Sequence, residues 1–222
     1  MKEIVVTAFS ELHEVIERYD TRNVIYRGVN SVAYPLVPKI GRVVPPDSVK
    51  SREWNEKEIL RLFKEQALPY LDFMPENDWD WLALGQQYGL PTRLLDWTAN
   101  PLVACYFAVE EPSEDNSVIY AYRNDSYIVV EKYADPFKYN KVGKFIPRHV
   151  TRRITTQGGL FTIHPDPWVP FESGEMEKII IPKEIRVTLK KTLNKYGVDQ
   201  FSLFPGLDSL SAHIEWLQSK GD

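Results

Sequence analysis

Residues 81–108 place a short polar segment between two apolar stretches, and this arrangement constrains the fold more than any other part of the chain. Residues 78–88 have the apolar pattern of a helix, which Gly89 would end as a C-cap. An Asn-Pro pair at residues 100 and 101 is a typical start for a second helix. A buried core needs none of the polar groups in between, so we expect them to form a structural or functional network.

The polar segment is expected to be short and extended over residues 93–97. Its polar and aromatic members are Thr92, Arg93, Asp96, Trp97, Thr98 and Asn100. Two interpretations are open. Arg93 and Asp96 could form a buried ion pair that only holds the loop in place, or the segment could line a ligand site.

The composition is that of an ordinary soluble globular domain, with 222 residues of which 43% are hydrophobic and 26% charged. The formal net charge of −4 argues against a general affinity for nucleic acid, because binding the phosphate backbone depends on Lys and Arg. One basic cluster leaves a local phosphate or nucleic-acid contact open. It consists of Lys144, Arg148, His149, Arg152 and Arg153.

The single cysteine, Cys105, excludes an intrachain disulfide and favours the cytoplasm as the compartment. It lies in an apolar helical pattern, so we interpret it as a core residue and not as a nucleophile. No segment approaches the roughly twenty apolar residues of a membrane span, and the first residues lack the apolar stretch of a signal peptide. We therefore expect a soluble, cytoplasmic protein with no membrane partner.

The periodicity of apolar residues predicts helices early in the chain and strands later. The expected helices begin after Ser10 and after Ser51, the second stopping near Pro69, and further helices cover 183–196 and 207–217. The expected strands cover 23–29, 117–122, 127–131, 160–164 and 177–181, with loops at 31–49 and 165–175. This pattern predicts one α+β domain over residues 1–222, with N-terminal helices packed on a mainly antiparallel sheet.

Polar residues with ligand-binding chemistry also occur in two segments outside residues 92–100. Tyr26-Arg27-Gly28 places a guanidinium at a strand end beside open backbone, which suits bidentate capture of a phosphate or carboxylate. Gln157 precedes two glycines, so a ligand could approach its amide and the backbone closely. Each signal is weak alone, and a surface arginine at a turn is the alternative for Arg27.

Other chemistries have less support. The four histidines and Cys105 show no metal-ligand spacing, so we expect no metal site. Phosphate-binding glycine loops of the P-loop and Rossmann types are absent from the sequence. Glu175 and Glu177 share one face of a strand, where we expect them to form a solvated edge.

Four motifs of this chain resemble the FRG domain family, from about residue 23 to residue 214. They are Tyr-Arg-Gly, Gly-Leu-Pro-Thr-Arg-Leu-Leu-Asp-Trp-Thr-x-Asn-Pro-Leu-Val-Ala-x-Tyr-Phe-Ala, Arg-x3-Gln-x-Gly-x-Phe, and Leu-Phe-Pro-x-Leu-Asp near the end. The resemblance implies a bacterial protein, often in a phage-related or defence-related setting. The family usually has His where this chain has Gln87, and an amide does not exchange protons near neutral pH.

The order of the motifs is similar, more distantly, to the layout of ADP-ribosyltransferases. That resemblance implies NAD as the substrate, with catalysis by Arg27 on the pyrophosphate or adenosine ribose, Thr98 on the nicotinamide or its ribose, and Gln157 on the ribose 2′-hydroxyl. The other implied nucleotide contacts are Tyr26, Gly28, Thr92, Trp97, Asn100, Tyr106 and Phe161, with Tyr106 or Trp97 stacking on nicotinamide. An Arg93–Asp96 pair would support these residues from beneath.

Cleavage of NAD builds positive charge on the ribose, which carboxylates stabilise. Gln157 is uncharged and would stabilise that charge less than a glutamate. The sequence therefore leaves open a slow enzyme, a carboxylate from Asp96 or Glu177, or a site that only binds a nucleotide. An enzyme would act as a toxin or phage-defence effector on NAD or a protein target, and a binding site would make a sensing or protein-binding module. A nuclease-like toxin is a further alternative.

Overall fold

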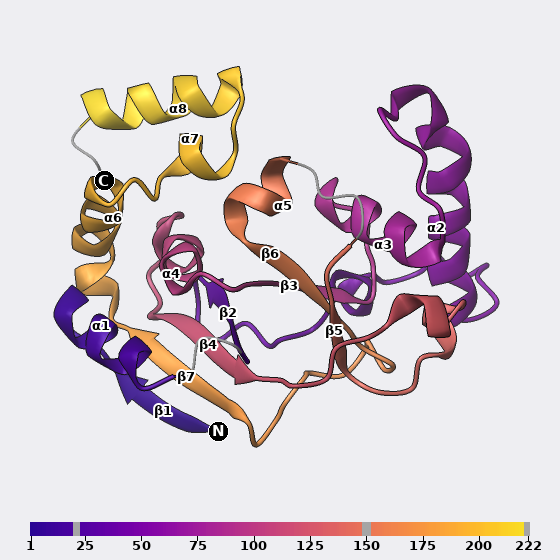
Figure 1. Ribbon diagram of the computed structural model, residues 1–222, viewed down its shortest axis with the longest axis horizontal. Helices are drawn as coiled ribbons and strands as arrows, with labels where there is room; N and C mark the ends of the chain where they lie inside the picture. Colours follow the sequence, from indigo (N-terminus) through magenta and orange to yellow (C-terminus); the bar gives the residue numbers. More distant parts are fainter. Residues whose placement is uncertain (20–22, 148–151, 220–222) are drawn as a thin grey trace.

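The computed structural model describes residues 1–19, 23–147 and 152–219, with only the backbone for residues 152–154. Its centre is a seven-stranded sheet with the strand order β1-β7-β4-β2-β3-β6-β5 (Figure 1). The strands are β1 (Lys2–Val5), β2 (Val24–Val29), β3 (Leu94–Thr98), β4 (Ser117–Arg123), β5 (Gly143–Phe145), β6 (Gly159–Ile163) and β7 (Met176–Ile181). The described strands pair in antiparallel fashion except β1 with β7, which confirms the predicted α+β fold with a mainly antiparallel sheet.

The helices gather in two groups, one over each half of the sheet (Figure 1). They are α1 (Phe9–Glu17), α2 (Arg52–Ala67), α3 (Asp78–Gln87), α4 (Pro101–Val109), α5 (Arg152–Gln157), α6 (Arg186–Lys195), α7 (Gln200–Leu203) and α8 (Leu207–Gln218). Residues of α1, α4, α6 and α7 share one core with β2, β4 and β7, and residues of α2 and α3 share another with β3, β5 and β6.

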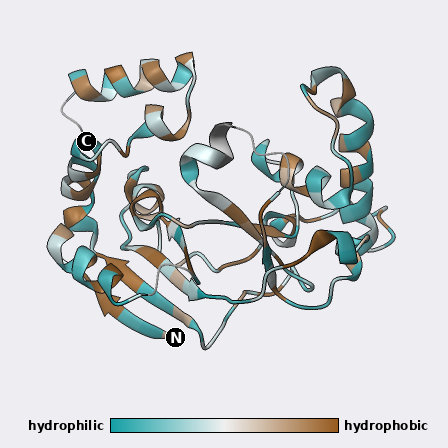
Figure 2. Ribbon diagram, in the orientation of Figure 1, coloured by the Kyte–Doolittle hydropathy of each residue, from teal (hydrophilic) through white to brown (hydrophobic). Residues whose placement is uncertain are grey.

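A third core lies on the opposite face of the sheet, where loops replace helices as the cover. Leu36 and Phe171, from the two predicted loops, pack there against Trp97 and Tyr122. Figure 2 shows hydrophobic residues concentrated along β7 and α4, in line with their burial between layers. None of the described helices is long and apolar enough to cross a membrane.

The two halves of the sheet meet at one narrow point. Strands β2 and β3 are paired only at Tyr26 and Thr98, whereas β2 and β4 are paired along six residues. Beyond that single pair the neighbouring strands are free to diverge, and a cleft opens beside them.

Local signals in the sequence located most element boundaries correctly. The side chain of Ser51 caps α2 by accepting a hydrogen bond from the Trp54 amide at 3.1 Å. Gly89 follows α3 with a φ of 80°, a left-handed conformation that favours glycine. The predicted strands at 23–29, 117–122, 160–164 and 177–181 are confirmed to within one residue at each end.

Other predicted elements are wrong or incomplete. Helix α1 begins at Phe9 and not after Ser10, because the Glu11 carboxylate accepts hydrogen bonds from the Thr7 amide and hydroxyl and fixes an earlier start. Residues 127–131 form one isolated bridge at Tyr127 and then a 3-10 turn, since their apolar side chains pack into the core without a continuous partner strand. Strands β1 and β5 and helices α5 and α7 were not predicted.

Candidate functional site

The cleft beside the β2–β3 junction has a volume of about 470 Å³, within the usual range for small-ligand sites. Its walls come from all three polar segments that the sequence singled out. Strand β2 contributes Tyr26, Arg27 and Gly28, strand β3 contributes Asp96, Trp97 and Thr98, and the α5–β6 connection contributes Gln157, Gly159 and Phe161. The predicted convergence of these distant segments on one cavity is therefore present.

Arg27 is the central cation of this cleft. Its Nη1 donates a hydrogen bond to the Asp96 carbonyl oxygen at 2.7 Å and lies 3.5 Å from the Asp96 carboxylate. Its Nε is buried and has no hydrogen-bond partner within the described part of the chain. A guanidinium binds an oxyanion bidentately with two neighbouring N–H groups, so a buried, unpaired Nε is chemically suited to an anionic ligand.

Gln86, at the end of α3, contacts the same carboxylate oxygen of Asp96 as Arg27 does. The Gln86 Nε2 donates to the Asp96 Oδ2 at 2.7 Å, and the Thr92 hydroxyl donates to the Gln86 Oε1 at 2.5 Å. The backbone amide of Leu94 donates in turn to the Thr92 Oγ1 at 3.2 Å. Because the Thr92 hydroxyl donates to the side-chain oxygen of Gln86, the NH2 group of Gln86 is oriented toward Asp96.

Sequence reasoning missed Gln86 as a site residue. The available signal was an amide in the last turn of a helix, just before a Gly-Leu-Pro turn and ten residues before Asp96. Thr92 is fully buried and is not among the cleft-lining residues. The prediction that Thr92 contacts a ligand is therefore corrected, because its hydroxyl orients Gln86 instead.

The predicted ion pair between Arg93 and Asp96 is wrong. Arg93 binds Glu56 of α2 through two hydrogen bonds of 2.8 and 2.5 Å, and both side chains are buried. Its guanidinium also lies 4.9 Å from the centre of the Phe137 ring. Residues three apart in an extended segment point to opposite faces, so Arg93 turns into the core while Asp96 turns into the cleft.

Thr98 and Gln157 join β3 to the end of α5. The Thr98 hydroxyl donates to the Gln157 carbonyl oxygen at 2.6 Å and accepts from the Asn100 amide at 2.9 Å. The side-chain amide of Gln157 donates to the Leu203 carbonyl of α7 at 3.2 Å. Both residues line the cleft, but their hydrogen bonds to the protein show that they also brace its wall.

Two predicted ligand contacts lie elsewhere. Tyr106 faces a separate cavity and donates to the Glu110 carboxylate at 3.1 Å, because the rotation of α4 turns Phe107 toward the cleft instead. Burial raises the pKa of the Tyr106 phenol, with Glu110 as a further cause. Asn100 is exposed and caps α4 by accepting from the Leu102 amide at 2.9 Å, so its role is structural.

Three other predicted contacts do border the cleft but have strong packing roles. The Trp97 ring lies in the loop-covered core and its N–H donates to the Thr162 hydroxyl at 2.7 Å, which leaves the ring unavailable for stacking on a ligand. Phe161 packs against Phe145 in the core under α2 and α3. A Cβ on Gly28 would lie 1.8 Å from the Ala104 carbonyl oxygen, so glycine there lets β2 contact α4.

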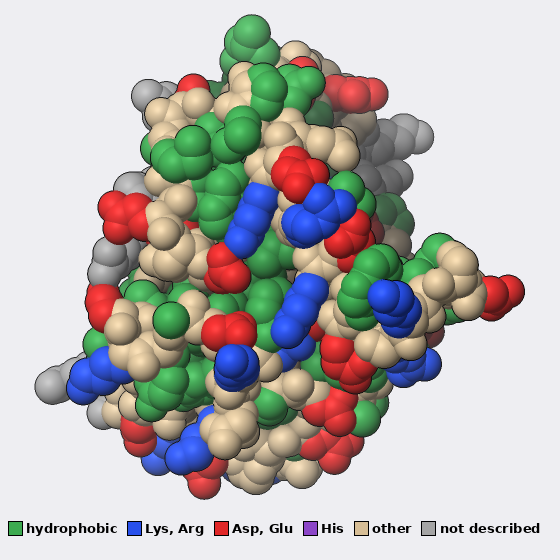
Figure 3. Space-filling model, turned by 90° about the vertical axis from the view of Figure 1, so that its right-hand side faces the viewer, with side chains coloured by type: hydrophobic (Ala, Val, Ile, Leu, Met, Phe, Trp, Pro, Cys, Tyr) green, Lys and Arg blue, Asp and Glu red, His purple; other side chains and the backbone are tan. Residues whose placement is uncertain are grey.

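The cleft is electrostatically mixed. Besides Arg27 and Asp96, its lining includes Arg42 from the loop after β2 and the carboxylates Glu110 and Glu111 at the end of α4. On the face drawn in Figure 3, Lys and Arg side chains are likewise interspersed with Asp and Glu side chains. A ligand that carries both negative and positive charge fits such walls better than a polyanion does.

Other predicted features lie outside the cleft. Glu177 accepts a 2.6 Å hydrogen bond from Tyr19 at another cavity, so it does not supply a carboxylate to this site. Within the described residues, no three His, Cys, Asp or Glu side chains are placed to hold a metal ion. Of the basic cluster, Lys144 is buried with its ammonium 4.4 Å from the Tyr127 ring centre. Arg148, His149 and the side chains of Arg152 and Arg153 lie outside the described residues.

A comparison with protein-family models matches residues 22–117 to the FRG domain. This part of the chain is therefore similar to FRG domains, as the sequence motifs predicted. The match covers β2, α2, α3, β3 and α4, and hence the residues Arg27, Gln86 and Asp96 of the cleft. Gln157 and the wall built by α5 and β6 lie beyond the matched residues. Searches of curated proteins and of solved structures returned no match.

Proposed function

We propose that this protein binds NAD, or a closely related nucleotide, in the cleft and transfers the ADP-ribosyl group to water or to an acceptor. The observation that carries the proposal is Arg27, which lines a cavity of about 470 Å³. Its Nε is buried and unpaired among the described residues, and its Nη1 lies 3.5 Å from the Asp96 carboxylate. Pyrophosphate is the anion that such a guanidinium would bind. The mixed charge of the walls suits a nucleotide that carries a pyrophosphate and a cationic nicotinamide.

In this proposal, Arg27 changes its partner from Asp96 to the ligand when a nucleotide binds. In the free protein the guanidinium partly neutralises the Asp96 carboxylate at 3.5 Å. A bound pyrophosphate would compete for Arg27 and leave the negative charge of Asp96 available to the ribose. Gln86, which holds the same carboxylate at 2.7 Å, would keep it in place during this exchange.

The reaction breaks the bond between C1′ of the ribose and the nicotinamide nitrogen, and the bonding electrons leave with that nitrogen as neutral nicotinamide. The ribose gains positive charge, which Asp96 would stabilise as carboxylates do in glycoside cleavage. Water or an acceptor group then bonds to C1′ and releases its proton to solvent. An enzyme of this kind would be a toxin or phage-defence effector, the setting that the family resemblance implies.

A second function, nucleotide binding without cleavage, is favoured by one specific observation. The Asp96 carboxylate already has two partners on its Oδ2, Gln86 and Arg27, and a carboxylate whose charge is partly neutralised in this way stabilises a developing cation less. If the pair with Arg27 persists when the nucleotide binds, the protein is a sensor and not an enzyme.

Incubation of the purified protein with NAD tests both functions, with nicotinamide release measured by chromatography and binding by thermal shift. We expect Arg27→Ala to abolish binding, and Asp96→Asn to retain binding but lower the rate by about 10²–10³-fold, as when other electrostatic stabilisers are removed. Arg52→Ala is the matched control, because Arg52 is an exposed residue at the start of α2 outside the cleft lining. Binding without nicotinamide release would support the second function, nucleotide binding without cleavage. If the wild-type protein does not bind NAD, both functions are refuted.

A further inference from the structure

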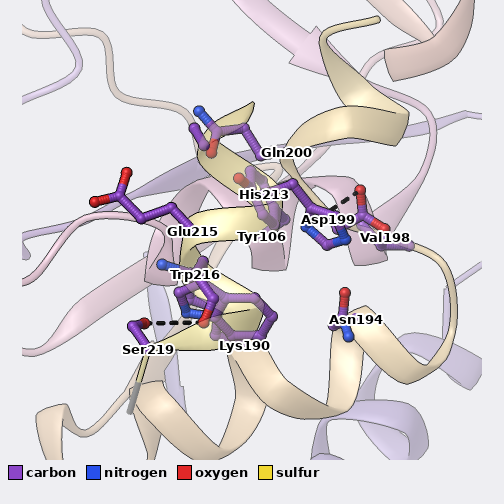
Figure 4. A pocket seen from close by; sticks show the side chains of 11 residues that line it. Tyr106, Lys190, Asn194, Val198, Asp199, Gln200, His213, Glu215, Trp216 and Ser219 are labelled. Atoms are coloured by element: carbon purple, nitrogen blue, oxygen red, sulfur yellow. Dashed lines mark hydrogen bonds and ion pairs between the residues drawn. The ribbon is translucent and has the colours of Figure 1, made fainter. Parts of the chain in front are cut away.

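A second cavity, of about 290 Å³, lies among α4, α6, α7 and α8, and it shares no lining residue with the cleft. Figure 4 shows side chains from these helices converging on it. We propose that this cavity binds a small zwitterion, of which a free α-amino acid is the simplest example. The volume lies just below the usual range for ligand sites and therefore favours a compact molecule.

One wall offers donors for a carboxylate. The Lys190 ammonium donates to the Glu110 carbonyl oxygen at 2.9 Å, and this hydrogen bond uses one of its three donors. Burial lowers the pKa of Lys190, because it removes water from the ammonium. The Lys190 ammonium lies 5.5 Å from the centre of the Trp216 ring, and the Trp216 Nε1 is buried with no partner among the described residues. A buried donor of this kind lacks the acceptor that folded proteins normally provide.

The facing wall offers an acceptor for an ammonium group. The Asp199 carboxylate is mostly buried and caps α7 by accepting from the Ser202 amide at 2.9 Å. His213 turns toward it, with 4.0 Å between the Nδ1 and the Oδ1 (Figure 4). The carboxylate of Glu215 points away from the other labelled side chains and adds negative charge at the rim.

The two walls together select the ligand class. An anion would be attracted by Lys190 but repelled by Asp199 and Glu215, and a cation would be attracted by the carboxylates but repelled by Lys190. A molecule with both charges satisfies each wall, with its carboxylate toward Lys190 and Trp216 and its ammonium toward Asp199. Val198 and Ala212 supply small apolar contacts for the remainder of the molecule.

The test is a binding screen with the twenty free L-amino acids and the dipeptide Ala-Ala, by thermal shift and then by titration calorimetry. We expect at least one of these probes to bind. Its N-acetyl derivative and its methyl ester, each lacking one charge, should bind at least tenfold more weakly. Lys190→Met, which keeps the side-chain stem, and Asp199→Asn, which keeps the helix cap, should each weaken binding at least tenfold. Lys191→Met, at an exposed neighbouring position outside the cavity, should leave binding unchanged.

Melting temperatures of the variants without ligand show whether each variant is folded. For a variant that is not, Trp216→Phe is the substitute, because it removes the indole N–H and retains a ring. The proposal fails if no probe binds, if the singly charged derivatives bind as tightly as the free amino acid, or if Arg27→Ala abolishes binding and so assigns the ligand to the cleft. None of these outcomes depends on whether the cleft binds NAD.

Discussion

The buried pair of Glu56 and Arg93 offers a direct test of how α2 is attached to the sheet. Glu56 is 1% exposed and Arg93 is 3% exposed, and two hydrogen bonds join them between α2 and the start of β3. Glu56→Leu would keep the buried volume roughly constant but leave the guanidinium charge without a partner. Removing one member of a buried ion pair costs about 3–5 kcal/mol of unfolding free energy.

For a chain of this size about 1 kcal/mol shifts the melting temperature by roughly 2–4 °C, so Glu56→Leu should lower it by about 6–20 °C. Urea denaturation followed by circular dichroism measures the free energy directly. The double variant with Glu56→Leu and Arg93→Met removes both charges and should recover most of the loss, because a buried pair replaced by apolar side chains is often nearly neutral.

The matched control is Glu58→Gln on the same helix. Glu58 pairs with Arg61 at 2.6 Å on the surface, where both groups are hydrated, so this change should leave the free energy of unfolding nearly unchanged. The reasoning is refuted if Glu56→Leu costs less than about 1 kcal/mol. It is also refuted if the double variant is as unstable as the sum of its two single changes, since no coupling would then exist.

Three further measurements test other parts of the structure. Gly28→Ala should destabilise the protein by about 1–3 kcal/mol or more in urea denaturation, because the added Cβ would clash with the backbone of α4; an unchanged midpoint would contradict the close packing. Burial lowers the pKa of His164 to about 3, below the value near 6.5 of the unfolded chain. The unfolded chain therefore takes up one more proton as the pH falls from about 6.5 to 3, so stability should decline there by about 1.4 kcal/mol per pH unit, and His164→Gln should remove that part of the slope. Burial also raises the pKa of Cys105 to about 12, so a thiol reagent should label it only at the rate of unfolding, and rapid labelling of the native protein would contradict its burial.

The helix boundaries that the sequence predicted correctly are set by interactions between neighbouring residues. Ser51 and Asn100 start their helices with side-chain caps, and Gly89 ends α3 in a left-handed conformation, because each of these features depends on residues within one turn of the boundary. The β-branched and aromatic residues likewise predicted four of the strands correctly. Polar residues that no core requires identified the three segments that line the cleft.

Contacts between distant segments could not be predicted from such local preferences. The partner of Arg93 is Glu56, 37 positions away, and only the packing of α2 on β3 selects it over the nearby Asp96. Edge strands β1 and β5 are short and carry little pattern of their own, so their partners β7 and β6 define them.

The sequence thus determined which residues form helices, strands and polar segments, because these preferences act over a few neighbouring positions. Only the tertiary structure decided that α4 turns Phe107 to the cleft and Tyr106 to the second cavity, and that Gln86 holds Asp96. The rotation of a helix and the choice of a hydrogen-bond partner are set by how whole layers pack, and that information is spread over the entire chain.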